Sequence, residues 1–97
     1  MATYVSLINW TDQGAKSAKE TVERANQAEA AMAALGVTLK SILWTVGPFD
    51  IITISEADDD ETATAALLAL GSGGNIRSTT MRAFDSDDMA RILAKLG

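Results

Sequence analysis

The sequence predicts an α+β fold with the element order β-α-β-β-α-β followed by a C-terminal helix. Two observations carry this prediction. β-Branched and aromatic residues gather in four short runs, and small or apolar residues recur at helical spacing after the first run and after the third. A length of 97 residues gives room for one core, so we expect a single domain over residues 1–97.

The first strand is predicted over Tyr4–Trp10, where β-branched and aromatic residues are frequent. Asp12 is expected to be the N-cap of a single amphipathic helix over Ala15–Leu35, whose apolar face is rich in alanine. Gly36 follows the last helical residue, where a left-handed C-terminal cap favours a residue without a β-carbon.

The second and third strands are predicted over Val37–Val46 and Phe49–Ala57. Only Gly47 and Pro48 separate them, and so short a link predicts an antiparallel hairpin. Pro48 suits a turn because its φ angle is fixed.

The second half of the chain predicts a helix, a strand and a last helix. Asp58 to Glu61 has the spacing of a capping box in front of a short helix over Thr62–Leu70. Gly71–Gly74 ends that helix, and the alternating segment Asn75–Phe84 predicts the fourth strand. Asp85–Asp88 is expected to cap the last helix, whose apolar residues are Met89, Ile92, Leu93 and Leu96.

This order of elements predicts the split βαβ, or ferredoxin-like, arrangement, a four-stranded antiparallel sheet with two helices on one face. Neither face is expected to be a plain water face, because the first strand has two mixed alternating sets, Tyr4, Ser6, Ile8 and Trp10 on one side and Val5, Leu7 and Asn9 on the other. The helix-free face is therefore expected to be partly apolar as well. A large exposed apolar patch marks an interaction site. We therefore expect a second copy to cover it, giving a homo-oligomer that is a dimer or a multiple of dimers.

Composition excludes several kinds of chemistry. The chain has no cysteine and no histidine, which excludes disulfides, thiolate catalysis, zinc ribbons and imidazole bases, and we expect neither a cofactor nor a metal. A net charge of −5 opposes binding to nucleic acid and to anionic membranes. The N-terminus has neither a basic region nor an apolar stretch, so we expect a cytoplasmic protein.

Several segments, taken together in this order and spacing, resemble the GYD-domain family over nearly the whole chain. They are Thr3-Tyr4-Val5, Trp10-Thr11-Asp12-Gln13-Gly14, Leu39-Lys40-Ser41, Trp44-Thr45, Gly47-Pro48-Phe49-Asp50, Ala69-Leu70-Gly71-Ser72, Gly74-Asn75-Ile76-Arg77-Ser78-Thr79-Thr80 and Arg82-Ala83-Phe84. The resemblance implies a small ferredoxin-like domain of the kind that pairs into dimeric α+β barrels. The glycine, tyrosine and aspartate that name the family map onto Gly47, Phe49 and Asp50. Phenylalanine replaces the tyrosine, so position 49 has no phenolic hydroxyl.

Five residues are candidates for a ligand-binding pocket, namely Asn9, Trp44, Asp50, Thr79 and Arg82. Asp50 could anchor a polar ligand or act as a base, but a carboxylate beside a turn more often accepts backbone N–H groups. Arg82 could clamp a carboxylate or phosphate, although an ion pair with Asp50 or Glu56 is the favoured alternative. Trp44 fits a core or an interface better than a ligand platform.

These features predict a homo-oligomeric domain that binds a small polar molecule in a regulatory role. The alternative is an assembly or interaction module in which the same residues make subunit contacts and no ligand exists. A cofactor-free isomerase or monooxygenase is a third hypothesis, which rests only on analogy with other α+β barrels. The glycine-rich segment Gly71–Gly74 follows a helix rather than a strand, so it is interpreted as a cap and connection instead of a phosphate loop.

Overall fold

A computed structural model describes residues 1–97 and confirms the predicted α+β fold and order of elements. The strands are β1 (Ala2–Trp10), β2 (Thr38–Trp44), β3 (Ile51–Ala57) and β4 (Ile76–Ala83). The helices are α1 (Asp12–Lys16), the 3₁₀ turn η1 (Ala18–Glu20), α2 (Thr21–Ala34), α3 (Asp60–Gly71) and α4 (Ser86–Ala94).

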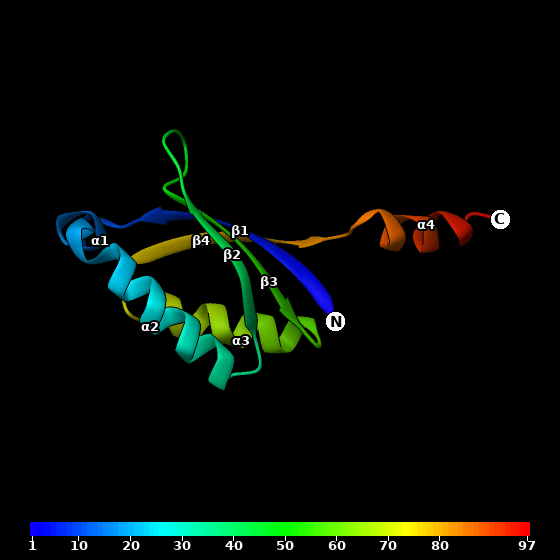
Figure 1. Cartoon of the computed structure of the whole chain (residues 1–97), viewed down its shortest axis with the longest axis horizontal. Coiled ribbons are helices and arrows are strands. Elements are labelled where there is room, and N and C mark those ends of the chain that lie inside the picture. The colour runs from blue at the N-terminus through cyan, green and yellow to red at the C-terminus, as the bar shows by residue number, and fades with distance from the viewer.

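The four strands form one antiparallel sheet in the order β2-β3-β1-β4. The two long helices lie on the same side of this sheet (Figure 1). Helix α2 packs mainly against the edge strand β2, and α3 packs mainly against β3 and β4. Strands β3 and β1 are the two inner strands of the sheet.

The single helix expected over Ala15–Leu35 is wrong, because the chain forms α1, η1 and α2 in succession. The helix breaks at Ser17, whose carbonyl oxygen and hydroxyl both accept hydrogen bonds from the Arg24 guanidinium, at 2.7 and 2.6 Å. The N-cap is also one residue earlier than expected. The Thr11 hydroxyl accepts from the Gly14 backbone N–H at 3.2 Å, and Asp12 is the first helical residue.

The prediction of a two-residue link between the second and third strands is also wrong. Strand β2 ends at Trp44 and β3 begins at Ile51, so the whole segment Thr45–Asp50 forms the connection. Asp50 explains the longer loop, because its backbone N–H donates to the carbonyl oxygen of Ile8 at 2.9 Å and holds this residue against β1.

A β-bulge in β2 changes which side chains share a face. Leu39 lies opposite Ser55 and Ser41 lies opposite Ile54, so Lys40 is an extra residue between these two pairs. Regular alternation put Leu39 and Ile42 on different faces, but the bulge places both on the side of the helices, where both line the same cavity.

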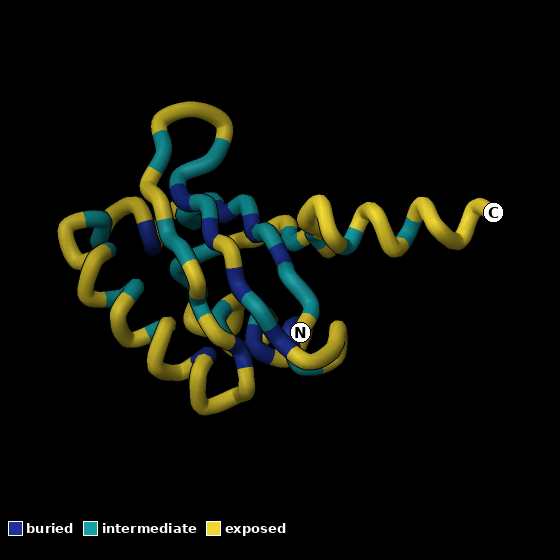
Figure 2. Tube along the Cα trace, turned by 45° about the vertical axis from the view of Figure 1, so that its right-hand side comes forward, coloured by how far each residue is buried: buried dark blue, intermediate teal, exposed yellow.

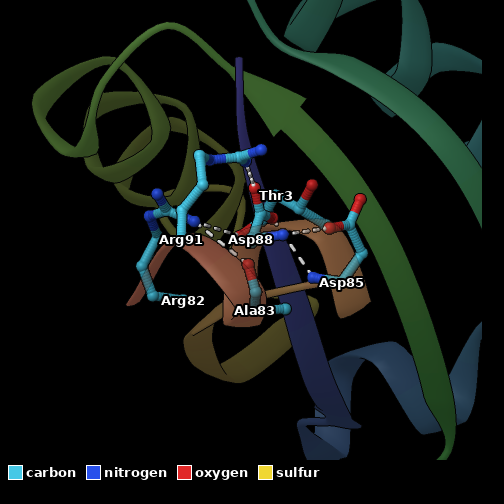
Figure 3. A network of polar contacts seen from close by, with 6 residues as sticks. All are labelled: Thr3, Arg82, Ala83, Asp85, Asp88 and Arg91. Atoms are coloured by element: carbon cyan, nitrogen blue, oxygen red, sulfur yellow. Dashed lines mark hydrogen bonds and ion pairs between the residues drawn. The ribbon is translucent and has the colours of Figure 1, made fainter. Parts of the chain in front are cut away.

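The cap of α3 differs by one residue from the prediction, whereas the cap of α4 is confirmed. The N-cap of α3 is Asp59, whose carboxylate accepts from the Thr62 backbone N–H at 2.8 Å. This hydrogen bond lowers the pKa of Asp59 below its ordinary value. Asp85 is the N-cap of α4, as expected, and it forms a capping box with Asp88 through reciprocal hydrogen bonds of 2.7 and 3.1 Å (Figure 3).

The hydrophobic core is small and lies at one end of the junction between helices and sheet. It consists of Tyr4, Met32, Val37, Ala57, Ala63 and Ala66. Three of these six residues are alanines, whose short side chains fill little volume. Helix α4 adds nothing to the core, since it has no buried residue and projects away from the sheet (Figures 1 and 2). The projecting helix gives the molecule its elongated extents of 52 × 30 × 17 Å.

Candidate functional site

The strand register divides the side chains of the sheet between two faces. Cross-strand partners lie on the same face, so the pairs Tyr4–Ser55 and Ser6–Thr53 share the face covered by the helices. The residues between them in the sequence point the other way. The helix-free face is called the open face below.

The open face carries a continuous apolar patch that crosses all four strands. Met81, Val5 and Ile54 are neighbours across β4, β1 and β3, and in the adjacent row Leu7, Ile52 and Leu43 are neighbours across β1, β3 and β2. Three of these side chains are well exposed, Leu43 at 60%, Met81 at 45% and Ile54 at 39%. Apolar patches of this kind in soluble proteins mark interaction sites.

Helix α4 presents a second uncovered apolar surface. Met89, Ile92 and Leu93 lie on one face of the helix, and Leu93 is 55% exposed. Leu96, expected on the same helix, lies two residues beyond its end at Ala94 and is 81% exposed. The polar side of this helix holds an ion pair between Arg91 and Asp88 (Figure 3). A helix of nine residues is marginal in isolation, so its apolar face is suited to docking on another protein surface.

A cavity of about 340 Å³ lies between α2, α3 and the helix-covered face of the sheet. We call it the helix–sheet cavity. Its walls are mainly alanines on the inner sides of the two helices, Ala25, Ala28 and Ala31 from α2 and Ala63, Ala66 and Ala69 from α3. The cavity exists because these short side chains do not fill the space above β1.

The floor of the helix–sheet cavity is polar at its centre. Thr80, Ser6 and Thr53 lie side by side across β4, β1 and β3, so their hydroxyls form one row. Ser6 and Thr80 are hydrogen-bonded to each other through their hydroxyl oxygens at 2.8 Å. Ser55 adds a further hydroxyl next to this row.

A second polar cluster lies near the start of α3 and shares Tyr4 and Thr80 with the lining of the helix–sheet cavity. The Tyr4 hydroxyl donates to an Asp60 carboxylate oxygen at 2.5 Å, and Arg82 lies 3.8 Å from the same oxygen. The Arg82 guanidinium also lies over the rings of Tyr4 and Phe84, with its central carbon 5.6 and 4.8 Å from their centroids. These groups border a shallow pocket of about 280 Å³, which also includes Thr64.

Burial and the hydrogen bond to Asp60 raise the pKa of Tyr4 from its ordinary value of 10.0 to about 12. Folding therefore favours the protonated phenol, and this contribution to the free energy of unfolding is complete below pH 10 and decreases as pH rises toward 12. We expect the melting temperature of the wild type to exceed that of Tyr4→Phe at about pH 9, and the difference to shrink with rising pH. Thermal unfolding of both proteins across this range checks the prediction, and a difference independent of pH would contradict it.

The five residues predicted to form a ligand pocket do not meet at one place. Asn9 and Thr79 lie on the open face, where the cross-strand partner of Asn9 is Arg77 and that of Thr79 is Leu7. Arg82 lies on the helix-covered side, where its ion-pair partner is Asp60 rather than the expected Asp50 or Glu56. Its guanidinium also donates to the backbone oxygens of Ala83 and Thr3 (Figure 3).

Trp44 and Asp50 have structural contacts. The Trp44 indole N–H donates to the Thr21 hydroxyl at 2.9 Å, which ties the end of β2 to the start of α2. The Asp50 carboxylate accepts from the Trp10 backbone N–H at 2.9 Å, and its carbonyl oxygen accepts from Thr45. Asp50 thus joins the loop to the end of β1, which is the structural role favoured for it from the sequence.

The helix–sheet cavity was not predicted from the sequence. Its hydroxyl row has a weak sequence signal, since Thr53 and Ser55 occupy alternate positions of a strand whose neighbours on that face are apolar. The alanine-rich faces of the two helices are the second signal. Neither signal locates a cavity without the register of the sheet.

No group of three or more acidic side chains could hold a metal ion, and none of the helices is long and apolar enough to cross a membrane.

Comparison with known proteins agrees with the fold. The profile of the GYD domain matches residues 4–93. A Thermus thermophilus protein named "Glutamine synthetase and cystathionine beta-lyase binding protein" is 29% identical over 90 residues, which cover 92% of this chain and 95% of that protein. A crystal structure of a protein from Thermus thermophilus has a similar fold, with a TM-score of 0.58 and 20% identity over 89% of this chain and 96% of that one.

Proposed function

The chain belongs to the GYD-domain family, and from that membership we propose that it is a self-associating module that regulates metabolic enzymes in the cytoplasm by binding to them. The apolar patch of the open face is the observation that carries this proposal. The Thermus relative supports the choice of partner, because its name states that it binds two enzymes, glutamine synthetase and cystathionine beta-lyase.

A second copy of the chain is the occupant that fits the open face. The patch crosses the full width of the sheet, so two copies related by two-fold symmetry, the commonest symmetry of homo-oligomers, would bury it against each other. Arg77 lies toward one end of the face and Glu56 toward the other. A two-fold axis that lies between the two sheets and perpendicular to the strands would bring the Arg77 end of one copy over the Glu56 end of its partner. Glu56 lies 3.7 Å from Lys40 of its own chain, and Arg77 of the partner would add a second cation beside it.

Light scattering during gel filtration tests self-association directly. At micromolar concentration we expect a particle of at least twice the chain mass of 10.2 kDa. A particle of one chain mass at all concentrations up to about 100 μM would overturn this part of the proposal.

Helix α4 is the element we assign to the enzyme partner. It projects away from the sheet (Figure 2). Its apolar residues Met89, Ile92 and Leu93, with Leu96 just beyond its end, follow the i, i+3, i+4, i+7 pattern by which an amphipathic helix docks into a groove. This assignment gives the two apolar surfaces two separable roles.

We expect Leu93→Asp to weaken binding to glutamine synthetase and cystathionine β-lyase from the same cell at least tenfold, because it buries a charge in the docked face. Ala94→Asp is the matched control, since it places the same charge at the next residue of α4, away from the face that carries Met89, Ile92 and Leu93. Calorimetry with the purified enzymes measures both variants, and light scattering should find their self-association unchanged. Equal affinity of the two variants would exclude α4 as the docking element.

A small polar ligand in a regulatory role is the second candidate function. The shallow pocket beside Arg82 favours it, because the guanidinium lies next to Tyr4, Thr64 and Thr80 there. Of the five residues predicted from the sequence, Arg82 borders this pocket and the other four do not. A thermal-shift screen with small metabolites, repeated on Arg82→Gln, tests this candidate: a shift that the variant loses supports it.

A further inference from the structure

We propose that the helix–sheet cavity binds a small carboxylic acid with an apolar or aromatic body. This inference goes beyond the proposed association, because the cavity lies on the opposite side of the sheet from the open face. Its volume of about 340 Å³ is roughly twice the 150 Å³ of a cavity that holds benzene, so it has room for a body of about two fused rings.

The shape of the cavity follows from two helices that stand apart. Helix α2 packs against one edge of the sheet and α3 packs against β3 and β4. Their facing sides carry alanines at successive turns, so the side chains do not close the space over β1. The apolar cluster that contains Met32 and Val37 fills one end of the junction. An apolar ligand body fits between the alanine walls.

The hydroxyls of the floor provide a second and independent indication of a ligand. Thr53 and Ser55 are 8% and 5% exposed, and both line the cavity. The Ser6 hydroxyl is paired with Thr80, but Thr53 and Ser55 have no such side-chain partner. Every fully buried side-chain nitrogen or oxygen in the chain has a hydrogen-bond partner. The hydroxyl oxygens of Thr53 and Ser55 have none, so they are not fully buried and open onto the cavity. A ligand oxygen seated here would receive hydrogen bonds that apolar strand residues could not give.

Arg24 determines the charge of the ligand. It is the one charged residue among those that line the cavity, and it lies at the end marked by Trp10 and Asn75. Its guanidinium is held by the backbone oxygens of Ser17 and Gly14, at 2.7 and 3.2 Å, and it has no carboxylate within ion-pair distance. Three of its hydrogen bonds go to neutral oxygens, which leaves donors for an anion.

Binding of 2-naphthoate, measured by ligand-observed NMR and calorimetry on the full chain, tests the site. We expect saturable binding with a Kd of about 1 mM or tighter. Ala28→Leu fills the cavity and should weaken binding at least tenfold. Ala30→Leu makes the same change on the exposed side of α2 and should bind like the wild type. Absence of saturable binding, or equal affinity of the two variants, would overturn the proposal.

The acidic class of the ligand is tested with Arg24→Gln and the uncharged analogue 2-naphthamide. The variant should weaken 2-naphthoate at least tenfold and leave 2-naphthamide unchanged, since only the carboxylate needs the positive charge. The amide also reports whether the cavity stays intact when Arg24 loses its contacts to Ser17. Equal loss of both probes would overturn the assignment of a carboxylic acid. Light scattering on Ala28→Leu should give the wild-type mass, so failure of this site and failure of self-association are separate results.

Discussion

Gly14→Ala should lower the free energy of unfolding by about 2 to 4 kcal/mol, one of the largest effects of a single methyl group in this chain. A β-carbon at Gly14 would lie 2.0 Å from the carbonyl oxygen of Asn75 and 3.0 Å from its carbonyl carbon. Both are backbone atoms, so a change of side-chain rotamer cannot relieve the clash. The same Asn75 oxygen accepts from the Thr11 backbone N–H at 3.0 Å, and moving it would break the hydrogen bond that joins the end of β1 to the start of β4.

Gly71→Ala is the matched control. Its β-carbon would meet nothing within 4 Å, and Gly71 is the last residue of α3, where alanine is the better helix former. We expect this variant to have wild-type stability or to gain up to about 1 kcal/mol. Urea denaturation followed by circular dichroism measures both variants. Equal stability of the two would show that the segment before β4 can move away from α1 without cost.

The sequence predicted the order of the elements well because each element is encoded locally. The strand propensity of β1 and the acidic cap at Asp85 and Asp88 depend on residues that are neighbours in the chain. The break of the first helix at Ser17 coincides instead with hydrogen bonds from Arg24, seven positions away, to the Ser17 carbonyl oxygen and hydroxyl. The loop Thr45–Asp50 similarly depends on contacts between Asp50 and β1. Such tertiary contacts leave no local pattern.

The candidate site was harder to predict because it depends on register. Strand alternation alone cannot tell that Thr80, Ser6 and Thr53 form a row, since this requires knowing how β4, β1 and β3 are aligned. One extra residue is enough to move side chains to the other face, as the bulge at Lys40 does in β2. Pocket residues chosen from sequence position therefore became distributed over two faces and a loop.

The apolar character of the open face, in contrast, follows from the alternation of residues along each strand, and the strand register confirms it. No alignment of the strands could hide Val5, Leu7, Ile52 and Ile54 under the helices together with Tyr4 and Ile8, because successive residues of a strand point to opposite sides. The structure places the first four on the open face, where they form the patch that the proposed dimer would cover.

Ile54→Asp should prevent self-association at micromolar concentration. Ile54 lies in the middle of the open face, with Val5 on one side and Ser41 on the other. In the proposed dimer the aspartate would be desolvated without a cationic partner, and two-fold symmetry repeats this cost in both copies. A penalty of about 3 kcal/mol or more corresponds to a Kd that rises more than a hundredfold. The single chain should still fold, because the Ile54 side chain is 39% exposed there.

Leu68→Asp separates this effect from a general effect of added charge. Leu68 is 71% exposed on α3, away from the open face, and the substitution adds the same charge in place of an apolar side chain of similar size. Light scattering should give the wild-type mass for Leu68→Asp and one chain mass for Ile54→Asp, and circular dichroism should find both folded. If both Ile54→Asp and Leu68→Asp still associate, the contact between copies lies elsewhere than on the open face. If both are monomeric, the added negative charge itself causes the loss of association. Only the split result, with Ile54 required and Leu68 dispensable, is consistent with copies joined through the open face of the sheet.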